Sequence, residues 1–174
     1  MNATLSSYLL EDHARLGELL DRSVAEPDRF DHVAFEEFRG GLLRHIAIEE
    51  KILLPAVRRK NGGIPLPLAL PLRVEHAALA SLLVPSPDAA LVGELRRVLE
   101  QHNPREEGPE GLYAICEERC GSEVAALIAQ ARAMPAVRTA PHQDGPGVIR
   151  TAAAALLSAA HIANAPKNAR GHSK

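Results

Sequence analysis

Hydrophobic residues recur at steps of three and four along most of the first 130 positions, the period of an α-helix with one buried face. This pattern predicts helices over about 4–25, 32–60 and 69–84, a fourth that begins near residue 88, and a shorter one near 110–133. The segments between them are rich in glycine and proline, which end regular helices. The chain is therefore predicted to be all-α.

The second predicted helix, 32–60, has the clearest pattern. Asp31 is a plausible N-cap for it, and Pro55 is expected to kink or loosen its last turn. One seam of this helix carries Phe35, Phe38, Leu42, His45, Glu49, Ile52 and Ala56. A histidine and a glutamate thus lie where core side chains are expected. Their neighbour Glu50 falls on another face and is expected to be solvated.

The other long helices also carry polar residues within an apolar seam. Each of the four carries one seam histidine, and two of these are followed four residues later by a glutamate. Residues four apart on a helix are neighbours on one face. The six residues are His13, His45, Glu49, His76, His102 and Glu106.

Binding of a shared cation explains the presence of these six polar residues in apolar seams better than six unrelated substitutions do. A single histidine in an apolar seam is usually a satisfied core residue, but four in four helices, two of them followed by a carboxylate at the same spacing, are hard to assign to chance. A buried, unpaired carboxylate costs several kcal/mol or more. Imidazole and carboxylate donors suit iron, manganese and zinc. Six donors fit two ions bridged by the two glutamates. The remaining histidines, His32, His142, His161 and His172, are expected at the surface or in the tail.

Composition narrows the partners and the location. The net charge of −2 gives no case for nucleic acid or an anionic membrane surface, and no apolar run is long enough to cross a membrane. The N-terminus lacks the features of a signal peptide. Cys116 and Cys120 are expected to be reduced thiols in a cytoplasmic protein, with a redox pair as the alternative. A composition change at Pro135 divides the chain into a helical bundle, 1–134, and a linker and tail, 135–174, with a possible helix near 148–163.

Four motifs together resemble the hemerythrin-like (HHE cation-binding) domain family. They are DHARL, RHIAIEEKILLP, NGGIPLPLALPLRVEHAAL and HNPREEGPEGLY, in that order over roughly residues 5–130. The resemblance implies an antiparallel up-down four-helix bundle around a non-heme di-iron centre. The four seam histidines would then be terminal ligands. Glu49 and Glu106 would bridge the irons, together with an oxo or hydroxo group.

The sequence departs from the family pattern at three places. Ala80 stands where oxygen-carrying hemerythrins have a further histidine, which implies an open or water-filled position on one iron. The GPEG insertion lengthens the connection after Glu106, so Glu107 or Glu110 is an alternative ligand. The tail beyond residue 135 matches nothing in the family.

Three functions are consistent with such a site. The first is reversible binding of O2, NO or a related small ligand in a dry pocket. The second is a redox enzyme that acts on peroxide, NO or O2; Tyr113 is the nearest acid–base candidate, although a packing role is expected for it. The third is an iron or oxygen sensor read by a protein partner. Binding or sensing is favoured over catalysis, and zinc or manganese could replace iron.

Overall fold

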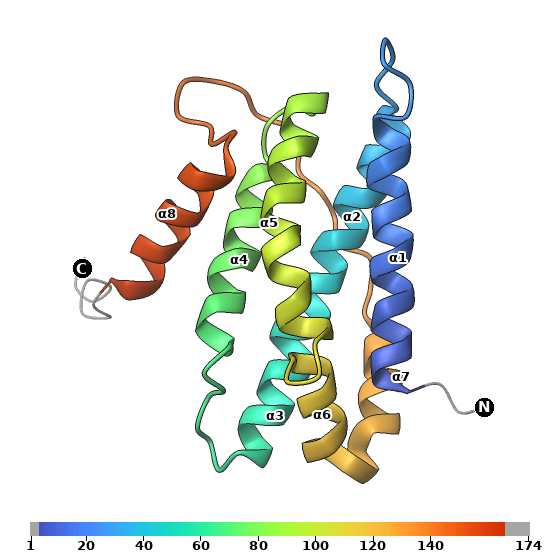
Figure 1. Cartoon of the computed structure of the whole chain (residues 1–174), viewed down its shortest axis with the longest axis vertical. Helices are drawn as coiled ribbons and strands as arrows, with labels where there is room; N and C mark the ends of the chain where they lie inside the picture. Colours follow the sequence, from blue (N-terminus) through green and yellow to red (C-terminus); the bar gives the residue numbers. More distant parts are fainter. Residues whose placement is uncertain (1–3, 166–174) are drawn as a thin grey trace, which may run out of the picture.

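The computed structural model describes residues 4–165, and its regular secondary structure is helical throughout this range. Four long helices run alternately up and down in one bundle (Figure 1). They are α1 (Leu5–Ser23), α2 (His32–Ile48), α4 (Ala69–Leu82) and α5 (Ala89–Glu107). The predicted all-α, antiparallel bundle is confirmed.

The helix starts follow from local chemistry. The side chains of Thr4, Asp31 and Asp88 each accept a hydrogen bond from a backbone N–H in the first turn of α1, α2 and α5. Such caps satisfy donors that the helix itself leaves unpaired. The predicted N-cap at Asp31 is confirmed.

The predicted helix over 32–60 is continuous in path but changes type in its second half. After α2 comes a π-helical segment, η1 (Glu49–Leu53), and then α3 (Leu54–Lys60). Pro55 has no N–H to donate, and its ring would clash with the carbonyl group four residues earlier in a regular α-helix. A wider turn relieves that clash. Such π-helical turns often lie at functional sites, and this one begins at Glu49.

The predicted helix near 110–133 is divided in the structure. It consists of α6 (Leu112–Cys120), a 3-10 turn η2 (Gly121–Glu123) and α7 (Val124–Ala133). Gly121 has a φ of 45°, a backbone conformation that favours glycine. The chain therefore turns at Gly121, and α7 returns alongside the lower end of α1 (Figure 1).

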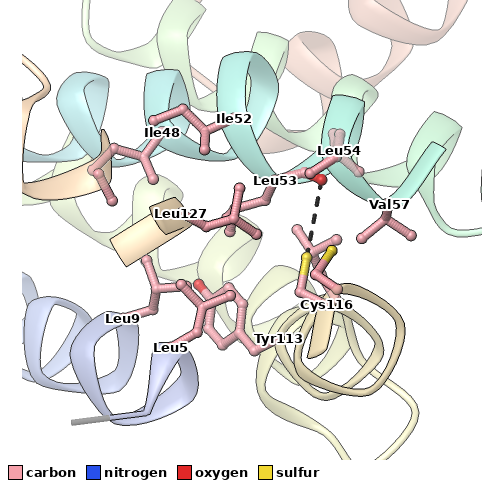
Figure 2. Close-up of a cluster of buried hydrophobic side chains, with 14 of the residues drawn as sticks. Leu5, Leu9, Ile48, Ile52, Leu53, Leu54, Val57, Tyr113, Cys116 and Leu127 are labelled. Carbon is pink, nitrogen blue, oxygen red and sulfur yellow. Dashed lines mark hydrogen bonds between the residues drawn. The ribbon is translucent and has the colours of Figure 1, made fainter. Parts of the chain in front are cut away.

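Two hydrophobic clusters fill the bundle, one towards each end. The lower cluster lies among the start of α1, η1, α3, α6 and α7; Figure 2 shows it around Leu5, Leu9, Leu53 and Tyr113. The upper cluster joins the other ends of α1, α2, α4 and α5 and includes the fully buried Phe35. The polar seam residues lie between the two clusters.

The C-terminal part of the chain is tied to the bundle. The segment after α7 runs along the bundle from its lower to its upper end and leads to α8 (Ala152–Asn164), which packs on α4 (Figure 1). The prediction of a helix near 148–163 is confirmed. His142, in this segment, is partly exposed; its Nε2 atom lies 2.5 Å from Glu36 Oε1 and its Nδ1 atom 3.3 Å from the Val84 carbonyl oxygen.

The division at residue 134 stays a prediction. Ala152, Ala155 and Ala159 of α8 belong to the upper cluster. His172 and the end of the predicted flexible tail lie outside the described residues. Within residues 4–165, none of the helices combines the length and the apolar character needed to cross a membrane.

Candidate metal centre

The six predicted residues converge at mid-height in the bundle. His45, Glu49, His76, His102 and Glu106 are buried, and the side chain of His13 is 10% exposed. Their donor atoms fall into two overlapping groups that share both glutamates, and within each group all atoms lie within 4.8 Å of one another. We call the His13–His45 side the first half and the His76–His102 side the second half.

In the first half, the Nε2 atoms of His13 and His45 are 2.9 Å apart. His45 Nε2 lies 3.2 Å from Glu49 Oε1, and His13 Nε2 lies 3.4 Å from Glu106 Oε2. Donors at right angles around an ion, with bonds of about 2.0–2.2 Å, lie about 3 Å apart. The observed separations are those of neighbouring donors in one coordination shell.

The second half repeats this geometry. His76 Nε2 lies 3.1 Å from Glu49 Oε2 and 3.3 Å from Glu106 Oε1. His102 Nε2 lies 3.0 Å from Glu106 Oε1. Each glutamate therefore presents one oxygen to each half. This is the disposition that two carboxylates bridging two ions would have.

A second ring of carboxylates surrounds the histidines. Each imidazole Nδ1 contacts a carboxylate oxygen from a neighbouring helix, at distances of 2.5–3.2 Å. The pairs are Asp12 with His45, Glu50 with His76, Glu75 with His102, and Glu107 with His13. The pairs form a closed ring around the bundle. A carboxylate of α1 contacts the histidine of α2, one of η1 contacts that of α4, one of α4 contacts that of α5, and one of α5 contacts that of α1.

This outer ring fixes the role of each imidazole. A carboxylate only accepts hydrogen bonds, so each Nδ1 must be the donor. In a neutral imidazole, Nε2 then carries a lone pair that points inward. Metal-bound histidines usually show this arrangement, with a carboxylate or carbonyl behind the ring. Two lone pairs 2.9 Å apart on His13 and His45 require either a proton or a metal ion between them.

Arginines stabilise three of the four outer carboxylates. Arg15 donates to Asp12, Arg73 to Glu50 and Arg105 to Glu75, at 2.7–3.1 Å. Burial alone would raise the pKa of Asp12, but the hydrogen bonds from His45 and Arg15 lower it to about 2. Asp12 thus remains ionised near neutral pH, and His76 and Arg73 likewise lower the pKa of Glu50 against the opposing effect of burial.

The inward-facing groups carry more negative charge than a bundle core tolerates without cations. Burial would lower the pKa of His45, yet the Glu49 and Asp12 carboxylates raise it to about 10. The pKa of His102 is raised to about 9 against the same effect of burial, by Glu106 and Glu75. Within residues 4–165, Glu49 Oε2 is buried and accepts no hydrogen bond of good geometry, although His76 Nε2 lies 3.1 Å away. Protons or metal ions must compensate this charge, so binding of a metal displaces protons.

Tyr113 lies in the site, which corrects the expectation that it only packs in the core. Its ring belongs to the lower cluster (Figure 2), while its hydroxyl oxygen is 2.8 Å from Glu49 Oε1 and 3.2 Å from Glu106 Oε2. Tyr113 follows the GPEG turn at the start of α6. A Cβ atom on Gly111 would come within 2.5 Å of the Glu106 carbonyl oxygen. Glycine there lets α6 begin directly against the end of α5.

The three candidate glutamates after His102 have different positions relative to the centre. Glu106 is fully buried and faces both halves, Glu107 contacts His13 from the outside, and Glu110 is exposed. The expectation that Glu50 is solvated is wrong, because it accepts from both His76 and Arg73. That these donors bind metal stays a prediction.

Several sequence candidates lie away from the centre. His32 and His161 are exposed, as predicted. Cys116 and Cys120 are buried free thiols in the lower cluster, and burial raises the pKa of Cys116 far above its usual value. Neither cysteine is among the grouped donors in residues 4–165. The donors that do converge, imidazole and carboxylate, fit iron, manganese or zinc.

Comparison with known families agrees with this geometry. The sequence profile of the hemerythrin HHE cation binding domain matches residues 4–115, which include all six inward-facing donors and Tyr113. Comparison with curated proteins and with solved structures finds no match. Since the matched segment is more than half of the chain and carries the whole site, the protein belongs to the hemerythrin HHE cation-binding domain family.

Proposed function

We propose that this protein holds two iron ions between its four histidines and two glutamates, and that it binds a small ligand such as O2 or NO there. The observation that carries the proposal is the placement of Glu49 and Glu106, each with one oxygen towards each half. His13 and His45 would bind one ion, and His76 and His102 the other. The family supports iron as the metal.

A cavity next to the centre supports the small ligand. Its volume is about 50 Å³, and it borders His13, His45 and His102. Leu16, Leu42, Phe38 and Leu99 supply most of the remaining wall. One water requires about 10–15 Å³ of such space, so the cavity suits a diatomic molecule and excludes a large substrate. A larger, open hollow at Thr4 and Arg132 contains none of the six donors.

The chain's own residues would control what reaches the irons. When bound, the irons would supply the redox-active positions at which O2 or NO attaches. The apolar wall would limit water at those positions. Asn103 lines the same cavity, and its buried Oδ1 atom has no hydrogen-bond partner within residues 4–165. This oxygen is therefore available to accept a hydrogen bond from a small ligand that carries a proton.

A redox enzyme that acts on peroxide or NO is the second candidate. The Tyr113 hydroxyl favours it, because a phenol that donates to Glu49 could also move a proton within the centre. A sensor, for which the C-terminal helix would be the element that a partner recognises, has less support, because α8 is docked on α4. We propose a reducing, cytoplasmic compartment because both cysteines are free thiols.

Metal analysis of anaerobically prepared protein, with optical spectra before and after O2 or NO, tests the proposal. We expect about two irons per chain, as in other di-iron bundles, and a spectral change that reverses when the gas is removed. Irreversible oxidation with peroxide turnover would favour the enzyme instead. A protein that retains a single colourless zinc would overturn the di-iron assignment.

A further inference from the structure

The two halves of the centre differ in one donor atom. The Tyr113 oxygen lies 3.1 Å from His13 Nε2 and 3.1 Å from His45 Nε2. With Glu49 Oε1 at 2.8 Å and Glu106 Oε2 at 3.2 Å, it contacts one atom of every member of the first half. Its hydrogen-bond contacts within residues 4–165 include neither histidine of the second half.

These four distances match a coordination geometry. An oxygen bound to the same ion as four neighbouring donors would lie about 3 Å from each donor at right angles to it, for bonds of about 2.0–2.2 Å. A single phenol hydrogen bond, by contrast, needs only one acceptor. Tyr113 approaches two nitrogens and two oxygens almost equally.

The fold holds the phenol in this place. The Tyr113 residue is 1% exposed, and its ring is packed in the lower cluster with Leu5 and Leu9 (Figure 2). Gly111, two residues before Tyr113, lies close against the Glu106 carbonyl group, and this close approach fixes where α6 begins. A donor placed by packing loses little conformational freedom when it binds.

We propose that Tyr113 is a seventh donor of the centre, whose phenolate oxygen coordinates the ferric ion held by His13 and His45. On coordination the phenol O–H bond breaks, an oxygen–iron bond forms, and the proton leaves to solvent. No electron is transferred in this step. The proposal rests on the proposed iron site, and it makes the two ions chemically different.

The charge around Tyr113 is consistent with this exchange. In the protein without a cation, burial and the carboxylates of Glu49 and Glu106 raise the pKa of Tyr113 well above its usual value. A ferric ion between these groups replaces the repulsion of two carboxylates by attraction to a trivalent charge. The same position that disfavours a free phenolate then favours a bound one.

Spectroscopy of the ferric protein tests the proposal without an activity assay. Ferric phenolate gives a visible charge-transfer band, and resonance Raman excitation within that band enhances the vibrations of the tyrosine ring. The chain contains two tyrosines, Tyr8 and Tyr113, so Tyr8→Phe is a matched control. We expect the band and ring vibrations in the wild type and in Tyr8→Phe, and their loss in Tyr113→Phe.

Iron content, measured on the same samples, separates this proposal from the proposed function. Two irons per chain without phenolate vibrations in the wild type would overturn the tyrosine ligand and leave the di-iron site standing. Phenolate vibrations that persist in Tyr113→Phe would overturn it as well. Wild-type protein that takes up no iron would overturn both proposals. The aromatic ring is retained in Tyr113→Phe, so the lower cluster stays filled.

Discussion

The two halves of the centre present the same types of donor atom, yet they differ in surroundings. Each has two histidines and one oxygen from each of two glutamates. The first half also has the Tyr113 hydroxyl and the partly exposed His13, whereas all four donors of the second half are buried. Ala80 lies one turn after His76 and offers no donor to the second half.

This difference shows that four similar helices can build an uneven site. The histidines and glutamates come from the repeated helical pattern, which is nearly symmetric. The asymmetry comes from α6, an element outside the four long helices, and from the replacement of a possible ligand by alanine. We therefore expect the two ions to differ in ligand number, and variants of the two halves to differ in spectrum.

The largest effect is expected from Glu106→Ala, because Glu106 is shared. It removes one oxygen from each half, and iron content should fall from about two per chain to near zero. Metal analysis of the purified variant, with circular dichroism to verify folding, measures this. Exposed Glu110→Ala is the matched control and should load normally. Two irons retained in Glu106→Ala would rule out a bridging role.

A smaller effect is expected when one half alone is changed. His45→Ala removes a first-half donor, and His102→Ala a second-half donor. Each should leave about one iron per chain, since each glutamate still offers an oxygen to the intact half. If the proposed tyrosine ligand is correct, only His102→Ala keeps the phenolate signal. Loss of all iron in both variants would mean that the halves do not load independently.

The outer carboxylates should have a weaker, graded effect. Asp12→Asn affects His45 in the first half, and Glu75→Gln affects His102 in the second. Loss of such a partner typically lowers metal affinity about 10–100-fold. Competition with a chelator measures this loss, and Asp21→Asn at the far end of α1 is the control. An affinity equal to wild type in Asp12→Asn would show that this carboxylate does not orient His45.

The smallest effect on metal is expected from ending the chain after Met134. Within residues 4–165, all of the inward-facing donors precede that residue, so iron content should be unchanged. Thermal stability should fall, because Arg39 loses its bond to the Ala140 carbonyl and the upper cluster loses the alanines of α8. Differential scanning calorimetry and iron analysis measure both. Loss of second-half iron would mean that α8 supports α4 and His76.

Much of the bundle and all six inward-facing donors were accessible from sequence, because their signals are local. His45 and Glu49 are one turn apart on the same helix, and spacing alone places them on one face. Asp31 caps α2 through a backbone N–H three residues away. Such relationships need no knowledge of how the helices pack.

Relationships between helices were not accessible in the same way. The pairing of Asp12 with His45 depends on the rotation of α1 and α2 about their axes, and a rotation of one residue position is about 100°. Glu50 was assigned to solvent for this reason, although α4 brings His76 to it. Tyr113 was misjudged because the turn at Gly111 decides where α6 begins.

The sequence by itself determined the helical period, the seam histidines and the two glutamates that follow them by one turn. Only the tertiary structure decided that each glutamate divides its oxygens between two histidine pairs, that a closed ring of carboxylates orients the imidazoles, and that Tyr113 joins one half. The physical reason is the difference in sequence separation between the contacting residues. Helical spacing fixes neighbours within one turn, whereas contacts across the bundle depend on packing of the whole core.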